Sequence, residues 1–358
     1  MADKPLTRGD RAPNFFLADH RDIVISLNDK VKGGPIVIFF YPTRADKAAA
    51  TEFDCFLKLA DAFAKAGTHL FLVGGDEVSE LAQPALSLGK NGYVVYDPVG
   101  DTARSYGVRG LRTVFLLDPN ARILARFAAG DTPLAERVLE AAQAVRPEPP
   151  QTLNTHPPIL VIPNVLDGDF CRYLIDQYHS RGSKESGTFR VVDGELVKAL
   201  NYDVKKRRDH HVVDRDLLDK ISGLISRRVL PEMRRAFQCN ITRIEEFKIG
   251  CYESTTGGYF HVHRDNTTPQ TAHRRFAMSL VLNNEEFEGG FLRFPEFGNV
   301  RYKPPTGAAI IFSCHLLHEL GAVAKGTRYV LLSFLLDEEG RKLLAKRQKK
   351  TSRQLHTN

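Results

Sequence analysis

Apolar and polar positions follow different patterns in the two halves of the chain. In the first half, apolar runs typical of strands alternate with segments of helical periodicity, in the order 36–41, 48–66, 69–73 and 79–88. A further apolar stretch at 113–124 is interrupted by Pro119 and Asn120, which predicts a hairpin. Strands that alternate with helices are typical of an α/β domain with a central sheet. We therefore expect residues 1–145 to form one α/β domain.

The second half is dominated by short apolar or alternating runs, which predict strands. It opens with a strand-like run at 159–166, and Asp167 then predicts the cap of a helix that continues through Tyr178. Another helix is expected at 217–237, because apolar residues recur there at helical spacing. We expect that helix to brace a sheet rather than to contact a substrate.

Length and composition are those of a globular protein with two domains. The 358 residues are 42% apolar and 26% charged, so both halves can build cores. No apolar run approaches the ~18 residues of a membrane span, and the N-terminus lacks an apolar core, so we expect a cytoplasmic protein without membrane association. The five cysteines show neither zinc-site spacing nor a disulfide framework, and we interpret them as reduced core thiols.

Two polar segments lie outside the predicted domains. Residues 146–158 are rich in proline, which predicts an extended, semi-rigid linker before a second domain at 159–338. In the basic tail, 339–358, the stretch after Gly340 contains seven lysines and arginines and no acidic residue, which equals the net charge of +7. We interpret this tail as a solvated end. Nucleic-acid binding is not expected, because basic and aromatic residues are not interleaved.

One motif in the second half has the composition of a metal site. His263 and Asp265 are separated by one residue, so on an extended strand both point to the same side while Arg264 faces away. His318 follows the apolar run at 308–312 and can arrive from another strand. Two histidines and one carboxylate occupy one face of an octahedral Fe(II) and leave the opposite face open for a co-substrate and O₂. The sequence therefore predicts an iron-dependent oxygenase.

An arginine follows ten residues after the last of these ligands. Arg328 lies in the alternating segment 327–334, which we expect to be the antiparallel neighbour of the strand that carries His318. Its planar guanidinium would face the open side of the metal, a geometry that suits a dicarboxylate.

Other histidines near the motif are weaker candidates for metal ligands. His261 precedes His263 by two residues, but only His263 has a carboxylate at the right offset. His315 precedes His318 by three residues, but the glycine and arginine downstream fit His318 better. Residues 209–211 follow four basic residues, and we interpret them as a solvated loop near the pocket mouth. We expect three further side chains to line the pocket: Tyr259, His261 and Asn266.

Several segments of the second half match one known pattern: 251–252, 257–266, 280–283, 289–294, 318–320 and 326–328. With these segments, residues 158–337 resemble the prolyl-4-hydroxylase-like branch of the Fe(II)/2-oxoglutarate dioxygenases. The resemblance implies a mainly β double-stranded β-helix, or jelly roll, with supporting helices and with iron on His263, Asp265 and His318. It also implies that Arg328 pairs with the distal carboxylate of 2-oxoglutarate and that Tyr252 is a second anchor. Many prolyl hydroxylases have lysine in place of Arg328, so the resemblance is to the branch rather than to one enzyme.

Four segments of the first half match a second pattern: 9–15, 40–42, 106–108 and 112–113. They resemble a peroxiredoxin, which has the thioredoxin fold. The peroxide-reducing cysteine of that family would lie seven residues after Pro42, at Ala49, so this position offers no thiolate to attack peroxide. Arg112 stands where the activating arginine would be, and we interpret Cys55 as a buried helix residue. We expect a catalytically silent domain that serves docking, dimerisation or substrate presentation.

Three functions from different classes remain. The first is a 2-oxoglutarate oxygenase that uses O₂ to hydroxylate a protein side chain, prolyl included, or a small molecule, with release of succinate and CO₂. The second is a non-catalytic scaffold that binds metal or ligand, and the third is a thiol peroxidase with an accessory module. The sequence leaves open the substrate, any need for ascorbate, and a homodimer through the thioredoxin-like domain.

Overall fold

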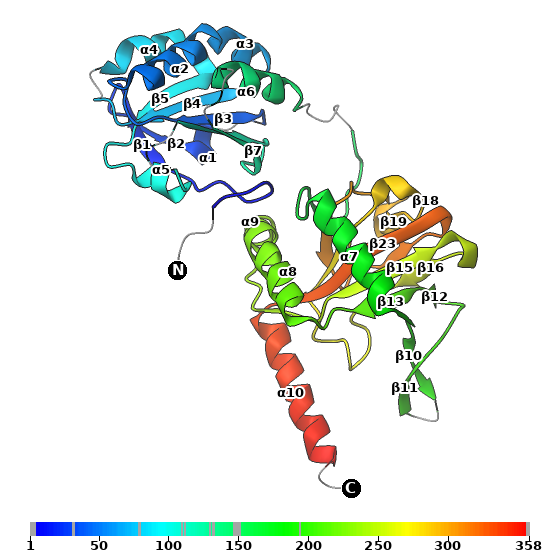
Figure 1. Ribbon diagram of the computed structural model, residues 1–358. Helices are drawn as coiled ribbons and strands as arrows, with labels where there is room; N and C mark the ends of the chain where they lie inside the picture. Colours follow the sequence, from blue (N-terminus) through cyan, green and yellow to red (C-terminus); the bar gives the residue numbers. More distant parts are fainter. Residues whose placement is uncertain are drawn as a thin grey trace. The chain divides into compact units, whose positions relative to one another are not determined.

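The computed structural model divides the chain into two compact units, Met1–Gln151 and Thr152–Asn358, and each is described by itself (Figure 1). The residues described are 5–30, 33–77, 80–108, 110, 112–128, 130, 133–145, 152–192 and 195–355. Residues 146–151 of the predicted linker lie outside the described residues, so the linker stays a prediction. Within the described ranges, no helix is both long and apolar enough to cross a membrane.

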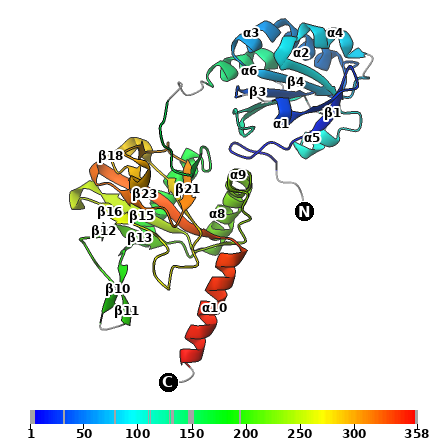
Figure 2. The same cartoon turned by 180° about the vertical axis from the view of Figure 1, so that it is seen from behind.

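The first unit is a seven-stranded mixed sheet with helices on both faces (Figures 1 and 2). In the order β2-β1-β5-β4-β3-β6-β7, the strands are Val24–Ser26, Phe16–Asp19, Gly92–Tyr96, His69–Gly74, Ile36–Phe40, Thr113–Leu117 and Ile123–Ala128. One face is covered by α2 (Lys47–Lys58), α3 (Ala60–Lys65), α4 (Ala82–Ser87) and α6 (Leu134–Gln143), the other by α1 (Leu27–Lys30) and α5 (Asp101–Ser105). This arrangement confirms the predicted α/β, thioredoxin-like fold and the hairpin of β6 and β7.

The helix predicted at 48–66 is in fact two helices. Leu59 separates α2 from α3, and its backbone N–H donates to the carbonyl of Cys55 at 3.1 Å. Phe53, Phe56 and Phe63 nevertheless belong to one buried cluster, because the apolar spacing continues across the break. The periodicity that predicts the helix therefore contains no signal for its interruption.

The second unit consists of two antiparallel sheets. In the larger sheet the order is β8-β21-β17-β23-β15-β13-β9, with strands Ile159–Ile162, Ala309–Ser313, Phe276–Val281, Val323–Leu336, Lys248–Glu253, Arg208–His211 and Lys184–Glu185. In addition, β14 (Arg243–Ile244) and β18 (Phe287–Gly289) pair with β23. The smaller sheet, β12-β16-β22-β19-β20, contains Lys205–Lys206, Tyr259–His263, His318–Leu320, Leu292–Arg293 and Arg301–Tyr302. A separate hairpin joins β10 (Thr188–Val192) to β11 (Glu195–Ala199).

The chain passes from one sheet to the other and back. In sequence order, β16 of the smaller sheet follows β15 and precedes β17 of the larger sheet, and β22 likewise follows β21 and precedes β23. This topology confirms the predicted double-stranded β-helix. The supporting helices are α7 (Gly168–Arg181), α8 (Arg215–Arg228) and α9 (Leu230–Phe237). They share one buried cluster with β15, β17, β21 and β23, so they brace the larger sheet as expected.

The local predictions for this unit are confirmed in part. Asp167 caps α7 by accepting a hydrogen bond from the N–H of Phe170 at 2.8 Å. The helix predicted at 217–237 breaks at Val229 into α8 and α9, and Pro231, which lacks an N–H, is in the first turn of α9. The last element among the described residues is α10 (Glu338–Leu355), which includes most of the segment predicted to be a tail.

Candidate metal centre

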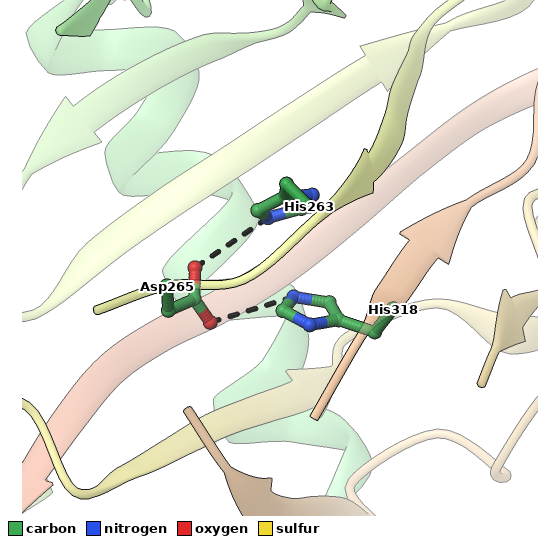
Figure 3. Close-up of side chains that lie close together, drawn as sticks. All are labelled: His263, Asp265 and His318. Carbon is green, nitrogen blue, oxygen red and sulfur yellow. Dashed lines mark ion pairs between the residues drawn. The ribbon is translucent and has the colours of Figure 1, made fainter. Parts of the chain in front are cut away.

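Two facing strands of the smaller sheet bring the predicted ligands together. His263 is the last residue of β16 and lies directly across from His318, the first residue of β22 (Figure 3). Asp265 lies beyond the strand end in a turn, where its N–H donates to the carbonyl of Cys314 at 3.0 Å. The two-residue spacing thus brings both side chains to one point, although only His263 is on the strand.

The three side chains converge at the separation that a metal ion requires. One carboxylate oxygen of Asp265 lies 3.4 Å from Nε2 of His263, and the other lies 3.4 Å from Nε2 of His318 (Figure 3). One ligand atom from each residue lies within 4.8 Å of the other two. Metal–ligand bonds of about 2.1 Å place adjacent octahedral ligands about 3.0 Å apart. The geometry therefore fits two histidines and one carboxylate on one face of an ion.

Hydrogen bonds to the backbone set the tautomer of both histidines. Nδ1 of His263 lies 2.7 Å from the carbonyl of His261, and Nδ1 of His318 lies 2.9 Å from the carbonyl of Leu316. A carbonyl only accepts, so each Nδ1 carries the proton and each Nε2 presents a lone pair. Nε2 of His263 is buried and has no hydrogen-bond partner. An orphaned ring nitrogen beside a carboxylate fits a bound cation.

The charges at the site also suit a cation. Burial raises the pKa of Asp265, but the neighbouring His318 and His263 outweigh it and hold that pKa at about 2. Burial lowers the pKa of His318 below its ordinary value, although Asp265 opposes this. These shifts favour an ionised carboxylate at Asp265 and a neutral imidazole at His318, the protonation states in which these groups bind metals.

Arg328 faces the same cavity from the opposite sheet. It lies on β23, in the larger sheet, so the prediction that its strand neighbours that of His318 is wrong. The chain crosses to the other sheet after β22, and the cavity of about 340 Å³ between the sheets is lined by Arg328 and by all three candidate ligands. Only 5% of Arg328 is exposed, and no described residue accepts a hydrogen bond from its guanidinium. Burial lowers the pKa of Arg328 to about 10, so the group remains charged at neutral pH.

Tyr252 is the direct cross-strand partner of Arg328, on β15. Its side chain is 4% exposed and lines the cavity, and the guanidinium carbon of Arg328 lies 5.4 Å from its ring centroid. The two side chains predicted to anchor 2-oxoglutarate thus lie side by side on the inner face of the larger sheet.

None of the three side chains predicted to line the pocket is among the residues that surround the cavity: Tyr259, His261 and Asn266. The prediction assumed regular alternation along β16, but the register shifts between Phe260 and His263. Phe260 therefore lines the cavity together with His263, and the centroids of their stacked rings are 3.5 Å apart. His261 is exposed and stacks on Tyr259, whereas the amide of Asn266 donates to the carbonyl of Arg274 at 3.3 Å.

The interpretation of residues 209–211 as a solvated loop is wrong. They belong to β13, and Asp209 is 6% exposed because Arg207 neutralises it with two hydrogen bonds of 2.6 and 2.8 Å. Both residues line the cavity, and sequence reasoning missed them as part of the site. The available signal was the Arg-x-Asp spacing, since residues i and i+2 of a strand share one face. His315 is exposed, and its backbone carbonyl accepts a hydrogen bond from Arg264, the residue between His263 and Asp265.

In the first unit, Ala49 occupies the first turn of α2 and is fully buried. Its N–H donates to the carboxylate of Asp46 at 2.7 Å, and Nη1 of Arg112 lies 3.3 Å from the carbonyl of Ala48. Cys55 is half-buried on the same helix, and burial raises the pKa of its thiol. The raised pKa does not activate the thiol of Cys55, which is the one cysteine of this unit, and the assignment of Ala49 to the position of a peroxide-reducing cysteine stays a prediction.

Comparison with known proteins finds a different match for each half. Residues 8–126 match the AhpC/TSA family, and residues 247–336 match the 2OG-Fe(II) oxygenase superfamily. A putative chloroplastic peroxiredoxin Q of Oryza sativa is 29% identical over 122 residues, 32% of this chain and 56% of that protein. A PKHD-type hydroxylase of Pseudomonas fluorescens is 34% identical over 89 residues, 23% of this chain and 38% of that protein. The chain thus spans about half the length, or less, of these relatives.

Solved structures divide in the same way. A peroxidoxin of Mycobacterium tuberculosis is 25% identical, with a TM-score of 0.36 over 40% of this chain and 99% of that one. A viral collagen prolyl hydroxylase of Paramecium bursaria Chlorella virus-1 is 16% identical, with a TM-score of 0.37 over 49% of this chain and 94% of that one. The chain carries an AhpC/TSA, peroxiredoxin-like domain followed by a 2OG-Fe(II) oxygenase domain that is similar to prolyl hydroxylases.

Proposed function

We propose that the second domain is an Fe(II)- and 2-oxoglutarate-dependent oxygenase that hydroxylates a C–H bond of its substrate. His263, Asp265 and His318 hold the iron, and Arg328 and Tyr252 hold the distal carboxylate of 2-oxoglutarate. One observation carries this proposal: two buried groups that lack a partner line the same cavity. Nε2 of His263 has no hydrogen-bond partner, and the guanidinium of Arg328 has no acceptor among the described residues. A divalent cation and a dicarboxylate together satisfy both groups.

Iron and 2-oxoglutarate, when bound, supply oxidative decarboxylation to succinate and CO₂ and the transfer of one oxygen atom to the substrate. The side chains of the protein bind and orient. Arg328, on the larger sheet, neutralises the co-substrate carboxylate, and Asp265 offsets part of the metal charge. Apolar side chains around the cavity exclude water: Phe260, Leu292, Phe312, Leu320 and Leu332.

The substrate class follows from similarity rather than from the site. The PKHD-type hydroxylase and the prolyl hydroxylases to which the chain is similar make a protein side chain, prolyl included, the first class to test, and small molecules the second. Ascorbate belongs in the same assays as a reductant for the iron.

For the first domain we propose a role in docking, self-association or substrate presentation rather than peroxide reduction. Ala49 leaves the domain without its nucleophile, while the described residues still form a seven-stranded sheet and two buried apolar clusters.

A test that needs no substrate is an optical titration under anaerobic conditions. Fe(II) and 2-oxoglutarate added together should give a visible charge-transfer absorption, because a keto acid chelated to Fe(II) accepts electron density from the metal. Asp265→Ala should remove it, whereas Glu319→Gln, beside His318 but outside the cavity lining, should retain it. A protein that binds iron without this absorption would be a metal-binding scaffold, and the proposed oxygenase would be wrong.

A further inference from the structure

A buried ion pair lies against Tyr252, and the proposed chemistry does not use it. Arg207 and Asp209 have side chains that are 11% and 6% exposed. The hydroxyl of Ser186 donates to the same carboxylate at 2.6 Å, so both oxygens of Asp209 accept hydrogen bonds. Burial raises the pKa of Asp209, but Arg207 outweighs it and holds the pKa at about 2. Burying two charges costs desolvation free energy that their attraction does not always offset. An ion pair in this position is therefore a candidate for a functional role.

One guanidinium nitrogen of Arg207 is not used by the ion pair. Nε and Nη2 contact Asp209, while Nη1 donates to the hydroxyl oxygen of Tyr252 at 3.2 Å. A tyrosine hydroxyl has one proton and two lone pairs, and this contact fills a lone pair on the side of Arg207. Among the described residues, no acceptor takes the hydroxyl proton of Tyr252. That proton is therefore directed away from Arg207.

Gly250 leaves room for the side chain of Arg207 beside β15. Residues 248, 250 and 252 of β15 share the inner face, because side chains alternate along a strand. A Cβ at Gly250 would lie 3.2 Å from Cδ of Arg207 and 3.2 Å from Cδ1 of Leu332. A side chain at position 250 would crowd the stem of Arg207, whose Nη1 donates to the hydroxyl of Tyr252.

We infer that Arg207 is a positioning residue for the co-substrate: it occupies the acceptor side of the Tyr252 hydroxyl and turns the hydroxyl proton toward the carboxylate held by Arg328. This inference rests on the proposed function, because it takes 2-oxoglutarate as the ligand. Asp209 holds the guanidinium in place, and the free donors of Tyr252 and Arg328 then form a two-point clamp.

The test measures the affinity for 2-oxoglutarate by calorimetry on the full chain loaded with Mn(II). Arg207→Gln with Asp209→Asn removes both charges together, so that no unpaired buried charge is left to unfold the domain. Losing a directed hydrogen bond to a charged group should weaken 2-oxoglutarate binding roughly ten-fold, and Tyr252→Phe should do the same. When the three changes are combined, binding should weaken no further than about two-fold beyond Tyr252→Phe alone.

Two controls distinguish a positioning role for Arg207 from general damage to the domain. Affinity for Mn(II) should be unchanged in every variant, because the metal ligands are not altered. The matched neutralisation of another ion pair of the domain, Arg275→Gln with Asp337→Asn, should leave 2-oxoglutarate affinity unchanged, because neither residue lines the cavity.

An additive loss in the combined variant, or an equal loss in the matched pair, would overturn the role of Arg207 and leave the oxygenase standing. If the wild-type protein binds Mn(II) but no 2-oxoglutarate, the proposed function itself fails, and the inference fails with it.

Discussion

Arg328 should lower the free energy of unfolding of the unliganded protein. It is a buried cation, and its proposed acceptor, the carboxylate of 2-oxoglutarate, is then missing. Burial lowers its pKa from the ordinary value to about 10, which corresponds to roughly 3 kcal/mol of penalty on the charged form, at about 1.4 kcal/mol for each tenfold change. The side chain is 5% exposed, so solvent screening offsets little of this penalty. Arg328→Met keeps most of the apolar stem and removes the charge. We expect the unliganded second unit to gain about 1–3 kcal/mol.

The assay is urea unfolding followed by circular dichroism, without metal or co-substrate. The chain has no tryptophan, so secondary structure is the convenient signal, and the transition of the first unit is an internal reference that should not move. Arg207→Met is the contrasting control, since it leaves Asp209 buried and unpaired and should destabilise the second unit by about 3–5 kcal/mol. In the wild type, Mn(II) with 2-oxoglutarate should raise the midpoint, whereas in Arg328→Met the co-substrate should add nothing. A clear loss of stability in unliganded Arg328→Met would refute the reasoning.

Three further predictions follow from the site and from the first domain. His263→Ala or Asp265→Ala should abolish succinate formation and weaken Mn(II) binding at unchanged circular dichroism; retained turnover would exclude these ligands. The pKa of Asp209 is depressed to about 2, so its contribution of about 2 kcal/mol is present above about pH 4 and lost as pH falls toward 2. Arg207→Gln with Asp209→Asn should therefore flatten that part of the stability profile, and an unchanged slope would contradict the assignment. Peroxide consumption with a thiol reductant should be absent, and Cys55→Ser should change neither this nor succinate formation.

The sequence was sufficient where a local pattern determines the outcome. The alternation of strands and helices in the first half predicted the α/β fold with its central sheet, and the cap at Asp167 predicted the start of α7. The spacing of His263, Asp265 and His318 predicted a convergence that the paired ends of β16 and β22 produce. The first two predictions depend on local patterns, as does the shared direction of His263 and Asp265. The arrival of His318 depends on the pairing of β22 with β16, and there the residue types of a metal site supplied the prediction.

The sequence was insufficient where non-local pairing decides which way a side chain points. Because the register shifts between Phe260 and His263, Phe260 lines the cavity and His261 does not. The pattern of residue types along β16 does not reveal this shift. The crossing from β22 to β23 places Arg328 on the opposite sheet from His318, although the two are only ten residues apart. Both errors concern which sheet or face a residue joins, and that depends on strands distant in sequence.

Two arginines of this cavity show why the role of a basic residue beside or within a strand cannot be assigned from its type alone. Arg207 and Arg328 are both buried and both contact Tyr252, yet one is neutralised by a carboxylate two residues away and the other by no described residue. The first can be held in place before any ligand binds, whereas the second keeps its charge for an incoming anion. The proposed roles follow this difference: Arg207, paired with Asp209, orients the site, and Arg328, without a carboxylate partner among the described residues, binds. For the same reason, neutralising the first should damage the empty protein and neutralising the second should damage only its complex with the co-substrate.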